Sequence, residues 1–360
     1  MAIEVISLNK RFRRWDGIQK LSANRYAVDR KGVFGLVDDQ GAVIARPQWE
    51  TDFYFCKAYG EGLLPVANTH RSRGRKYGYI DLNGKPVLPM KWEHACEFCE
   101  GLAAVKSDGK WGFIDKAGEV ALPMQFSFAS GFSEGLAAVQ SNGKWGFINK
   151  AGEVVLPIQW DDTARVFSEG LARVKSNGKW GFINKAGEVA LPVQWEDVHS
   201  FSEGLAGVQL NGRWGYINKD GKVVIPMQWD YTGGFSEGFA GVQLNDKWGY
   251  VNKDGKVVIS MQWDDAEGFH EGFAQVRLNC KRGYINKDGK AAIPIQWDYV
   301  KGFSGGLTAV ERDGTWGICN KDGEMVIPVV CDEIDLVKKG EFLIRQNRDS
   351  HIIRVRDAEE

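Results

Sequence analysis

The chain has 360 residues, a formal net charge of −1 at pH 7, and 43% hydrophobic and 12% aromatic residues, including 14 tryptophans. This composition excludes an intrinsically disordered chain, because it supplies enough apolar surface for a long continuous core. No apolar run approaches the roughly 18 residues of a membrane-spanning helix, and the N-terminus lacks a basic segment followed by a long apolar stretch. We therefore expect a cytoplasmic protein without a membrane span.

One motif recurs along nearly the whole chain. The dipeptide Trp-Gly, or a degenerate form of it, marks each copy, at Phe34, Tyr77, Trp111, Trp145, Trp180, Trp214, Trp248, Arg282 and Trp316. Only the interval between the first two markers is clearly longer than the others. A nearly fixed period of about 34 residues indicates a repeat architecture, which overrides the two or so domains expected from length alone.

The chain begins and ends with fragments of a repeat. Residues 15–22 align without gaps with residues 229–236, the end of one repeat, whereas residues 340–345 and 352–355 resemble the first two strands of another. We therefore assign residues 1–22 to an N-terminal partial repeat, 23–339 to nine full repeats and 340–360 to a C-terminal partial repeat. Together they are expected to form one continuous repeat domain.

Each repeat predicts three short antiparallel strands. In the repeat at residues 134–160, the apolar runs are rich in Val, Ile and aromatic residues and too short for helices. Asn142-Gly143 suits a two-residue type I′ hairpin, and a second turn with a positive φ is expected at Gly152. Both faces of such a sheet are apolar, so each sheet requires a neighbour on both sides.

The second aromatic residue of each repeat follows the first at a constant interval, as Trp160 follows Trp145. We expect this second residue to seal the joint between neighbouring repeats. The glutamine before it, at Gln159, Gln194 and Gln228, is expected to satisfy a buried backbone group.

Two arrangements of the stacked sheets fit these patterns. We favour an open superhelical β-array over a closed β-propeller-like ring of about ten units, because propellers usually have four to eight blades of four strands. The ring would close by strand exchange if the strand near residues 4–8 paired with the C-terminal hairpin. In an open array the two terminal fragments are caps.

These motifs carry a resemblance to a known family. Glu-Gly-Leu-Ala at 134–137, Trp-Gly-Phe-Ile-Asn-Lys at 145–150 and Pro-Ile-Gln-Trp at 157–160 are similar to the bacterial WG-repeat family. The resemblance covers residues 15–347 and implies an all-β repeat scaffold with no catalytic residues to carry over. Local departures are Phe34, Tyr77 and Arg282 in place of Trp, and Ser260 in place of a strand-ending Pro.

Two of these departures fall in neighbouring repeats. Arg282 forgoes most of the burial that a tryptophan provides, and Ser260 lies in the repeat before it. We therefore predict the weakest joint between the repeats marked by Trp248 and Arg282.

The N-terminal region is basic. Residues 1–90 contain 15 Lys+Arg against 9 Asp+Glu, a net charge of +6, which leaves the remaining residues at 31 against 38, a net charge of −7. The second repeat also has an insertion that lengthens its first hairpin at residues 67–76. Its cations are the candidate contacts for an anionic partner, Arg71, Arg73, Arg75 and Lys76. A solvated tip and a charged cap that prevents end-to-end association explain the same charges.

Catalytic and metal-binding patterns are absent. No phosphate-binding loop, nucleophile elbow or zinc-protease motif occurs, and the five histidines share no spacing. No second cysteine pair and no nearby histidine with ligand spacing completes a zinc site with Cys96 and Cys99, so we interpret the pair as a small-residue substitution. We predict no enzyme, cofactor or metal. Carboxylates that recur in every repeat, such as Glu134 and Asp161, are expected to accept hydrogen bonds in turns.

The positions that vary between repeats are the candidates for partner contact. They lie between the second aromatic residue and the next Phe-Ser-Glu-Gly, and the best of them are Arg165, His199, Tyr231 and Tyr299. Repeat proteins commonly bind along such an edge, although unselected drift would give the same variation.

We predict a monomeric, non-enzymatic scaffold that binds a protein or peptide. A polysaccharide or other polymer stacked on the repeated aromatic residues is the alternative, and a row of solvent-exposed tryptophans would favour it. Nucleic acid ranks last, because it rests on the basic end alone.

Overall fold

Repeated antiparallel β-sheets make up the fold. The computed structural model describes residues 2–7, 15, 17–22, 25–38, 41–50, 61–68, 74–164, 167–338, 341–346 and 349–356. Every regular element within these ranges is a β-strand, and nearly all the sheets are open and four-stranded. The predicted all-β class, built from short tandem repeats, is confirmed. None of the described elements is a helix long and apolar enough to cross a membrane.

The chain forms two compact units. The N-terminal unit comprises Leu8–Phe167 and Lys185–Gly187, and the C-terminal unit comprises Met1–Ser7, Ser168–Asn184 and Glu188–Glu360.

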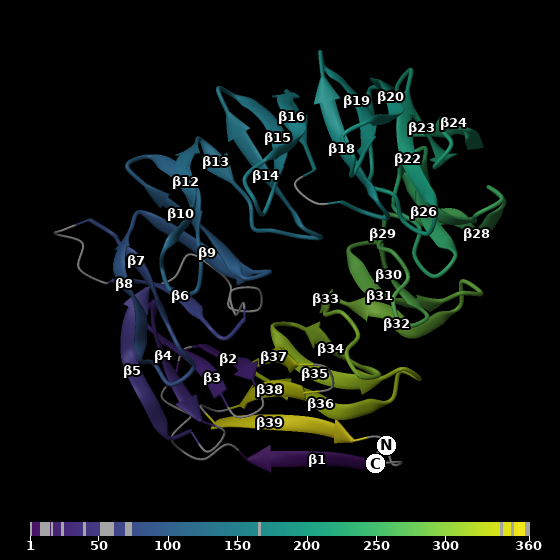
Figure 1. Ribbon diagram of the computed structural model, residues 1–360. Coiled ribbons are helices and arrows are strands. Elements are labelled where there is room, and N and C mark those ends of the chain that lie inside the picture. Colours follow the sequence, from purple (N-terminus) through teal and green to yellow (C-terminus); the bar gives the residue numbers. More distant parts are fainter. Residues whose placement is uncertain are drawn as a thin grey trace. The chain divides into compact units, whose positions relative to one another are not determined.

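The N-terminal unit contains one large sheet and two four-stranded sheets (Figure 1). The strands of the large sheet are β2 (Gly17–Ser22), β3 (Arg25–Arg30), β4 (Val33–Asp38), β5 (Val43–Glu50), β6 (Leu64–Asn68), β7 (Tyr77–Ile80) and β8 (Pro86–Trp92). The other strands of this unit are β9 (His94–Cys99), β10 (Leu102–Ser107), β11 (Lys110–Ile114), β12 (Val120–Phe126), β13 (Phe128–Ala129), β14 (Leu136–Ser141), β15 (Lys144–Asn149), β16 (Val154–Trp160) and β17 (Asp162–Thr163).

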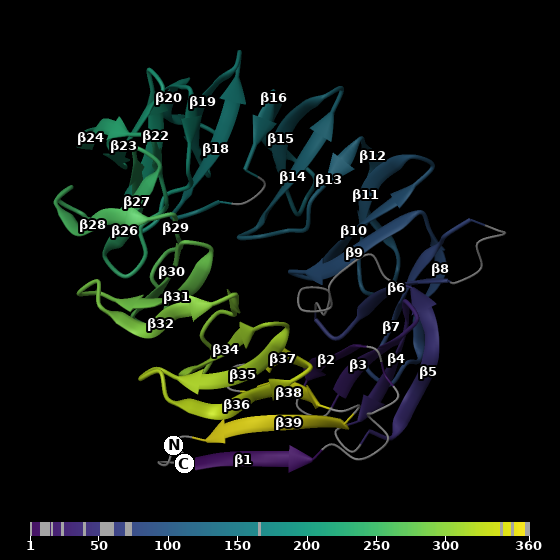
Figure 2. The same ribbon diagram turned by 180° about the vertical axis from the view of Figure 1, so that it is seen from behind.

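In the C-terminal unit consecutive strands lie side by side within each repeat, as both views of β34 to β36 show (Figures 1 and 2). Its strands up to the sixth full repeat are β18 (Leu171–Ser176), β19 (Lys179–Asn184), β20 (Val189–Trp195), β21 (Asp197–Val198), β22 (Leu205–Leu210), β23 (Arg213–Asn218) and β24 (Val223–Trp229). The next three repeats contribute β25 (Tyr231–Thr232), β26 (Phe239–Leu244), β27 (Lys247–Asn252), β28 (Val257–Trp263), β29 (Asp265–Ala266), β30 (Phe273–Leu278), β31 (Lys281–Asn286), β32 (Ala291–Trp297), β33 (Tyr299–Val300), β34 (Leu307–Arg312), β35 (Thr315–Asn320) and β36 (Met325–Cys331).

The sheets have one strand more than the three predicted. After the second aromatic residue the chain turns, and two residues pair with the next hairpin, as Tyr231 and Thr232 pair with Gln243 and Val242. These residues were expected to lie in loops. They form a strand because their backbone groups sit against a buried hairpin, where an unpaired N–H or C=O is costly.

The glycine of each Trp-Gly pair is required by a close backbone approach. A Cβ atom at Gly215 would lie 2.5 Å from the carbonyl oxygen of Ile225, and one at Gly146 would lie 2.6 Å from that of Leu156. The last strand of the sheet, β24, bulges beside Gly215, because its register shifts between the partners of Trp214 and Tyr216. A larger residue cannot occupy the glycine position without moving this last strand.

The predicted turns are confirmed. Asn142 and Gly143 have φ angles of 50° and 77°, as a type I′ hairpin requires, and Gly152 has a φ of 82°. A third positive-φ pair occurs at Glu134 and Gly135, between Ser133 and Leu136, which form a β-bridge. This turn places a carboxylate at the same point of seven successive repeats, from Glu61 to Glu271, and Gly305 replaces it in the last full repeat.

The core extends across both faces of the sheets, as predicted. Ala137, Ala138 and Val139 are successive residues of β14 and all are fully buried. The second aromatic residue packs between neighbouring sheets, because Trp229 belongs to one cluster with Tyr216 of its own repeat and Phe235 of the next.

The prediction for the glutamine before the second aromatic residue is wrong. Gln159, Gln194 and Gln228 are exposed. Successive residues of a strand point to opposite faces, so burial of Trp160 turns Gln159 outward.

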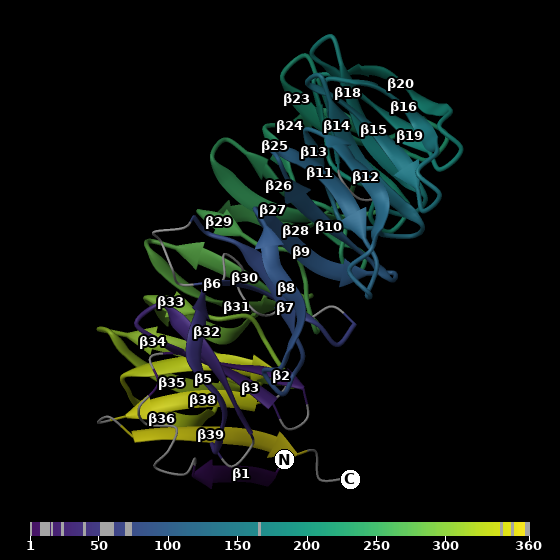
Figure 3. The same ribbon diagram turned by 60° about the vertical axis from the view of Figure 1, so that its left-hand side comes forward.

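The two ends of the chain meet in one sheet of the C-terminal unit. This sheet has the order β1 (Ala2–Ser7), β39 (Asp349–Arg356), β38 (Glu341–Gln346), β37 (Glu333–Lys338), and β1 lies alongside β39 in Figures 1 and 3. The pairing is antiparallel and runs from Ala2–Arg356 to Ser7–His351. The pairing of the N-terminal strand with the C-terminal hairpin, which was expected for the ring alternative, is therefore present.

Candidate functional site

The repeated glutamates link neighbouring repeats through a hydrogen bond and an ion pair, which together we call the glutamate staple. The carboxylate of Glu100 accepts a hydrogen bond from the backbone N–H of Gly135 at 3.1 Å and pairs with Lys150 at 3.0 Å. The hydrogen bond from Lys150 lowers the pKa of Glu100 below its usual value. The same pair of contacts recurs at Glu61, Glu169, Glu203, Glu237 and Glu271.

The second row of carboxylates also joins neighbouring sheets. The Asp264 carboxylate, which follows β28, accepts the N–H of Asn279 at 2.7 Å from the hairpin of the next sheet, and it pairs with Lys247 of β27 at 2.6 Å. Both rows are structural, as the sequence indicated. The reach of both rows into the next repeat was not predicted, because strict repetition makes every spacing equivalent in sequence.

A second staple uses the tyrosines that follow some of the Trp-Gly pairs. The Tyr216 hydroxyl donates to the carbonyl oxygen of Gly233 at 2.8 Å, and the Tyr284 hydroxyl donates to that of Lys301 at 2.7 Å. Each bond joins a sheet to the segment that opens the next sheet. Phenylalanine at the same position in other repeats, such as Phe147, cannot make this bond.

Two of the predicted contact residues come together around one tryptophan. His199 is mostly buried, and its ring stacks on Trp214 with a centroid distance of 4.5 Å and an interplanar angle of 11°. The Tyr231 ring packs between Trp214 at 5.5 Å and Trp248 at 5.7 Å, and it contacts His199 at 5.6 Å. Burial lowers the pKa of His199. This histidine is therefore part of the joint, whereas Tyr231 reaches the surface.

Tyr299 occupies the position equivalent to Tyr231, two repeats further along. Its ring contacts Trp316 at 5.8 Å and lies under the guanidinium of Arg282, whose Cζ is 5.2 Å from the ring centroid. Exposed fractions of 42% for Tyr231 and 45% for Tyr299 make them the most exposed aromatic residues of the described chain. Arg165, the fourth candidate, lies outside the described residues.

Arg282 affects the joint with the following repeat. The weakest joint was predicted on its preceding side, but its guanidinium meets Tyr299 of the following repeat. The difference arises because the face of a strand that bears a side chain depends on the register, which the sequence did not fix for this residue.

Three more polar residues share the face of the sheet that carries Arg282. Asp265 lies opposite Arg277, Arg277 lies opposite Arg282, and Gln275 is two residues from Arg277 on the same strand. Directly opposed residues, and residues two apart, lie on one face. We call Asp265, Gln275, Arg277, Arg282 and Tyr299 the polar joint. Arg282 and Tyr299 were singled out from the sequence. Gln275 and Arg277 were not, although their spacing of two residues on one strand was a signal that could have found them.

The basic insertion is described only in part. Arg71 and Arg73 lie outside the described residues. The Nε of Arg75 is 3.5 Å from the carboxylate of Glu50, and its guanidinium lies 5.4 Å from the centroid of the Tyr77 ring. Lys76 closes the base of the hairpin, where its carbonyl accepts the N–H of Asn68 at 3.0 Å. Of the two described cations, Arg75 is therefore already paired with a carboxylate.

A separate cleft lies in the first full repeat of the N-terminal unit. It has a volume of about 470 Å³ and is lined by Trp15, Arg30, Val43, Arg46 and Pro47. Arg30 and Arg46 are exposed. The sequence did not predict this cleft, because its lining comes from three segments that only the folded sheet brings together.

The cysteine pair shows no sign of reactivity. Cys96 and Cys99 are free thiols, and burial raises the pKa of Cys96 to about 12. A thiol with so high a pKa is not a nucleophile near neutral pH.

A sequence model described as WG containing repeat matches eight consecutive segments of the chain. They are residues 77–111, 111–145, 145–180, 180–214, 214–248, 248–281, 283–316 and 316–347. No functionally curated protein matches the sequence.

Several solved structures are similar at low identity. The crystal structure of a eukaryotic initiation factor superposes with a TM-score of 0.54 at 11% identity, over 85% of this chain and 96% of that chain. Virginiamycin B lyase from Staphylococcus aureus has a TM-score of 0.32 at 13% identity, over 63% of this chain and 94% of that chain. The first similarity supports the fold alone, and the second carries no argument.

Proposed function

The chain belongs to the family of WG-containing repeat proteins, and we propose that it is a non-enzymatic scaffold that binds a protein or peptide through the first strands of its sheets. The exposure of Tyr231 and Tyr299, at 42% and 45%, carries this proposal. Each ring is held by neighbouring side chains, so its ordering on binding costs little conformational entropy. Tyrosine is also enriched at protein interfaces.

The tryptophans support a peptide over a polysaccharide. None of the 14 tryptophans is exposed, and all of them lie in the described ranges. Stacking on sugar rings requires open aromatic faces, and these rings are used in the core and in the joints. The two tyrosines offer isolated contact points, which suit a folded or extended protein partner.

Affinity capture from the source organism tests the proposal when it is made residue-specific. The full chain and a variant with Tyr231→Ser and Tyr299→Ser would serve as bait, with quantification by mass spectrometry. The matched control is Val223→Ser with Val257→Ser, because these outer-strand residues have similar exposures, 43% and 41%. We expect partners that the control retains and the tyrosine variant loses. Partners that both variants retain equally would contradict the proposal.

Anion binding is a second candidate function, and the cleft of the N-terminal unit favours it. Arg30 and Arg46 are exposed on its rim and belong to the basic N-terminal region. Calorimetric titration with inorganic phosphate at low ionic strength tests this function. We expect binding that Arg30→Ser with Arg46→Ser abolishes and that the control Lys85→Ser with Lys110→Ser retains. Equal losses would indicate an unspecific effect of net charge.

A further inference from the structure

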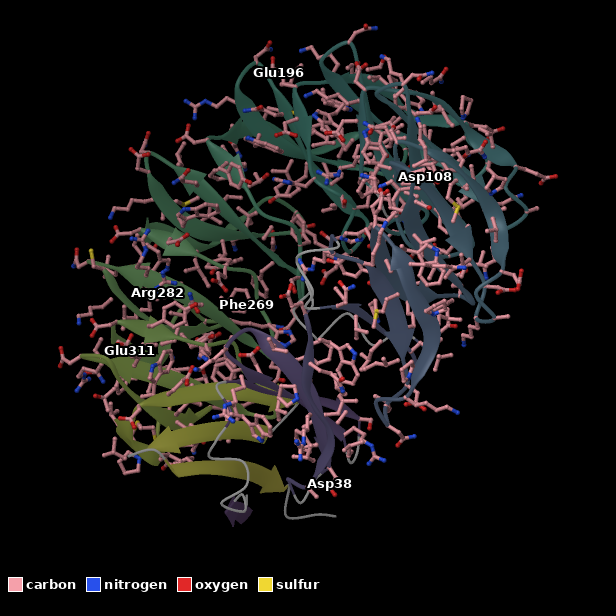
Figure 4. All side chains as sticks on the ribbon, turned by 90° about the vertical axis from the view of Figure 1, so that its left-hand side faces the viewer. Asp38, Asp108, Glu196, Phe269, Arg282 and Glu311 are labelled. Atoms are coloured by element: carbon pink, nitrogen blue, oxygen red, sulfur yellow. The ribbon has the colours of Figure 1, made fainter. Side chains whose placement is uncertain are left out.

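We propose that the polar joint is the specificity point of the scaffold, where Arg282 binds a carboxylate side chain of an acidic peptide segment. This inference rests on the proposed function, since it names the chemistry of the partner. Both sheets of the joint, β29–β32 and β33–β36, belong to the C-terminal unit. Figure 4 labels Arg282 on its strand and Glu311 on the neighbouring sheet.

The first argument is the concentration of substitutions. The preceding repeat has Tyr231, Gly241, Gln243 and Trp248 where this repeat has Asp265, Gln275, Arg277 and Arg282. Cross-strand pairing places all four on the face that meets the next sheet. The strands of this repeat also differ from the preceding repeat elsewhere, for example at Ala291, Ala292 and Ile295 of the outer strand, but the residues there remain apolar. The polar substitutions within the strands are the ones that gather on one face. Breaks in an otherwise consistent frame are expected at functional positions.

The second argument is the charge of Arg282. Arg277 lies directly opposite it, and like charges in that position repel each other. Asp265 is 3.7 Å from the Nε of Arg277, and the nearby carboxylate of Glu267 accepts the side-chain amide of Gln275 at 3.1 Å. Arg282 itself forms no hydrogen bond or ion pair with any residue in the described ranges. Its guanidinium therefore has donors for a carboxylate from outside.

The third argument is the setting of that guanidinium. Arg282 is half-buried, and Tyr299 covers one side of it with a half-exposed ring. A cation on an aromatic ring is held in orientation, and a planar guanidinium presents two parallel donors to a carboxylate. The exposed remainder of Tyr299 then contacts the peptide beside its acidic residue. An acidic segment with an apolar or aromatic neighbour fits this arrangement.

The test uses a fluorescein-labelled hexaglutamate peptide and a hexaglutamine control, with fluorescence anisotropy on the full chain. We expect hexaglutamate to bind more tightly than hexaglutamine, with an affinity that falls as salt rises. Arg282→Trp should weaken hexaglutamate binding by about tenfold, the size expected for one charge-assisted hydrogen-bonded pair. This variant restores the residue found in most other repeats, so the fold is not at risk.

Two further variants make the test specific. Lys290→Gln removes an exposed cation from the outer turn of the same repeat and should change the affinity less than about twofold, as expected for a screened surface charge. Arg282→Lys keeps the charge without the planar fork and should have an intermediate effect.

Three outcomes would overturn the proposal. They are equal binding of the two peptides, equal losses for Arg282→Trp and Lys290→Gln, and competition by acetate as effective as competition by hexaglutamate on a per-carboxylate basis. The last would show a site for free anions. None of them removes the dependence of captured partners on Tyr231 and Tyr299, so failure here and failure of the scaffold proposal are distinguishable.

Discussion

Two joints of the C-terminal unit use the same backbone with different side chains. Between the sheets β21–β24 and β25–β28, Trp214 is 2% exposed and packs against His199 and Tyr231. Between the sheets β29–β32 and β33–β36, the equivalent position is Arg282, and a cation–π contact to Tyr299 replaces the ring pair. The ring centroids of Trp214 and Tyr231 are 5.5 Å apart, and the Arg282 Cζ is 5.2 Å from the Tyr299 centroid, so the two side-chain contacts span the joints with a nearly constant spacing.

The constant spacing has a physical cause. Both joints retain the tyrosine hydroxyl bond, at 2.8 Å from Tyr216 and 2.7 Å from Tyr284. Both also retain the glutamate staple, although its contacts are longer at the polar joint: 3.4 Å from Glu271 to Gly306, against 3.0 Å from Glu203 to Gly238. These bonds link the two sheets in both joints. The position of Trp214 and Arg282 can therefore hold either a packed ring or a charged side chain.

The joint between the sheets β21–β24 and β25–β28, where Trp214 packs against His199 and Tyr231, is called the ring-closed joint. The largest test of this comparison places an arginine there. Trp214→Arg should destabilise the C-terminal unit by about 3–5 kcal/mol, the usual cost of truncating a buried tryptophan, because the ring contacts with His199 and Tyr231 are lost. Urea unfolding followed by hydrogen exchange of β23 and β25 measures the loss. A cost below about 1 kcal/mol, within the range of ordinary surface changes, would show that every joint tolerates an arginine.

The reverse substitution should stabilise the polar joint. Arg282→Trp removes the repulsion from Arg277 and adds buried apolar area, but it loses a cation–π contact of about 0.5–1 kcal/mol. We expect a net gain of about 1 kcal/mol, because a tryptophan–tyrosine pair contributes about 0.5–1.5 kcal/mol beyond burial. Slower amide exchange in β31 and β33 is the measurement. Destabilisation instead would mean that Arg282 has a structural partner in the folded chain.

Removal of the tyrosine hydroxyl should have the same effect at both joints. Tyr216→Phe and Tyr284→Phe each remove one hydrogen bond to a carbonyl, which costs about 1 kcal/mol. Phenylalanine fits the position, since Phe147 and Phe182 occupy it in other repeats. Chemical unfolding of the two single variants compares the joints. A much larger loss at Tyr284 would show that the polar joint depends on this bond more than the ring-closed joint does.

The smallest expected effect is the pH dependence of the glutamate staple. The hydrogen bond from Lys150 lowers the pKa of Glu100, so its contribution to stability is present above the ordinary value of 4.5 and is lost as pH falls through the lower folded value. For a half-exposed pair this contribution is about 0.5 kcal/mol. Thermal melts from pH 7 to pH 3 should show that Glu100→Gln is less stable than the wild type at pH 7 and that the difference shrinks as the pH falls below 4.5. A constant difference across this range would assign the effect to packing.

The sequence by itself determined the repeat, its turns and its core. Asn142-Gly143 specified a type I′ hairpin because few other pairs adopt two positive φ angles, and the apolar runs specified strands buried on both faces. The buried second aromatic residues and the structural role of the recurring carboxylates followed from repetition. Tyr231 and Tyr299 were chosen from the sequence as candidate contact residues because they vary within a fixed frame.

Tertiary structure decided what depends on contacts between strands. The added two-residue strand and the pairing of β1 with β39 each follow from a register that local sequence does not encode. The polar joint belongs to the same class. Its residues are separate in the sequence, and only the antiparallel pairing of β29, β30 and β31 brings their side chains to one face. A repeat sequence states which residues recur, whereas the fold determines which of the exceptions meet.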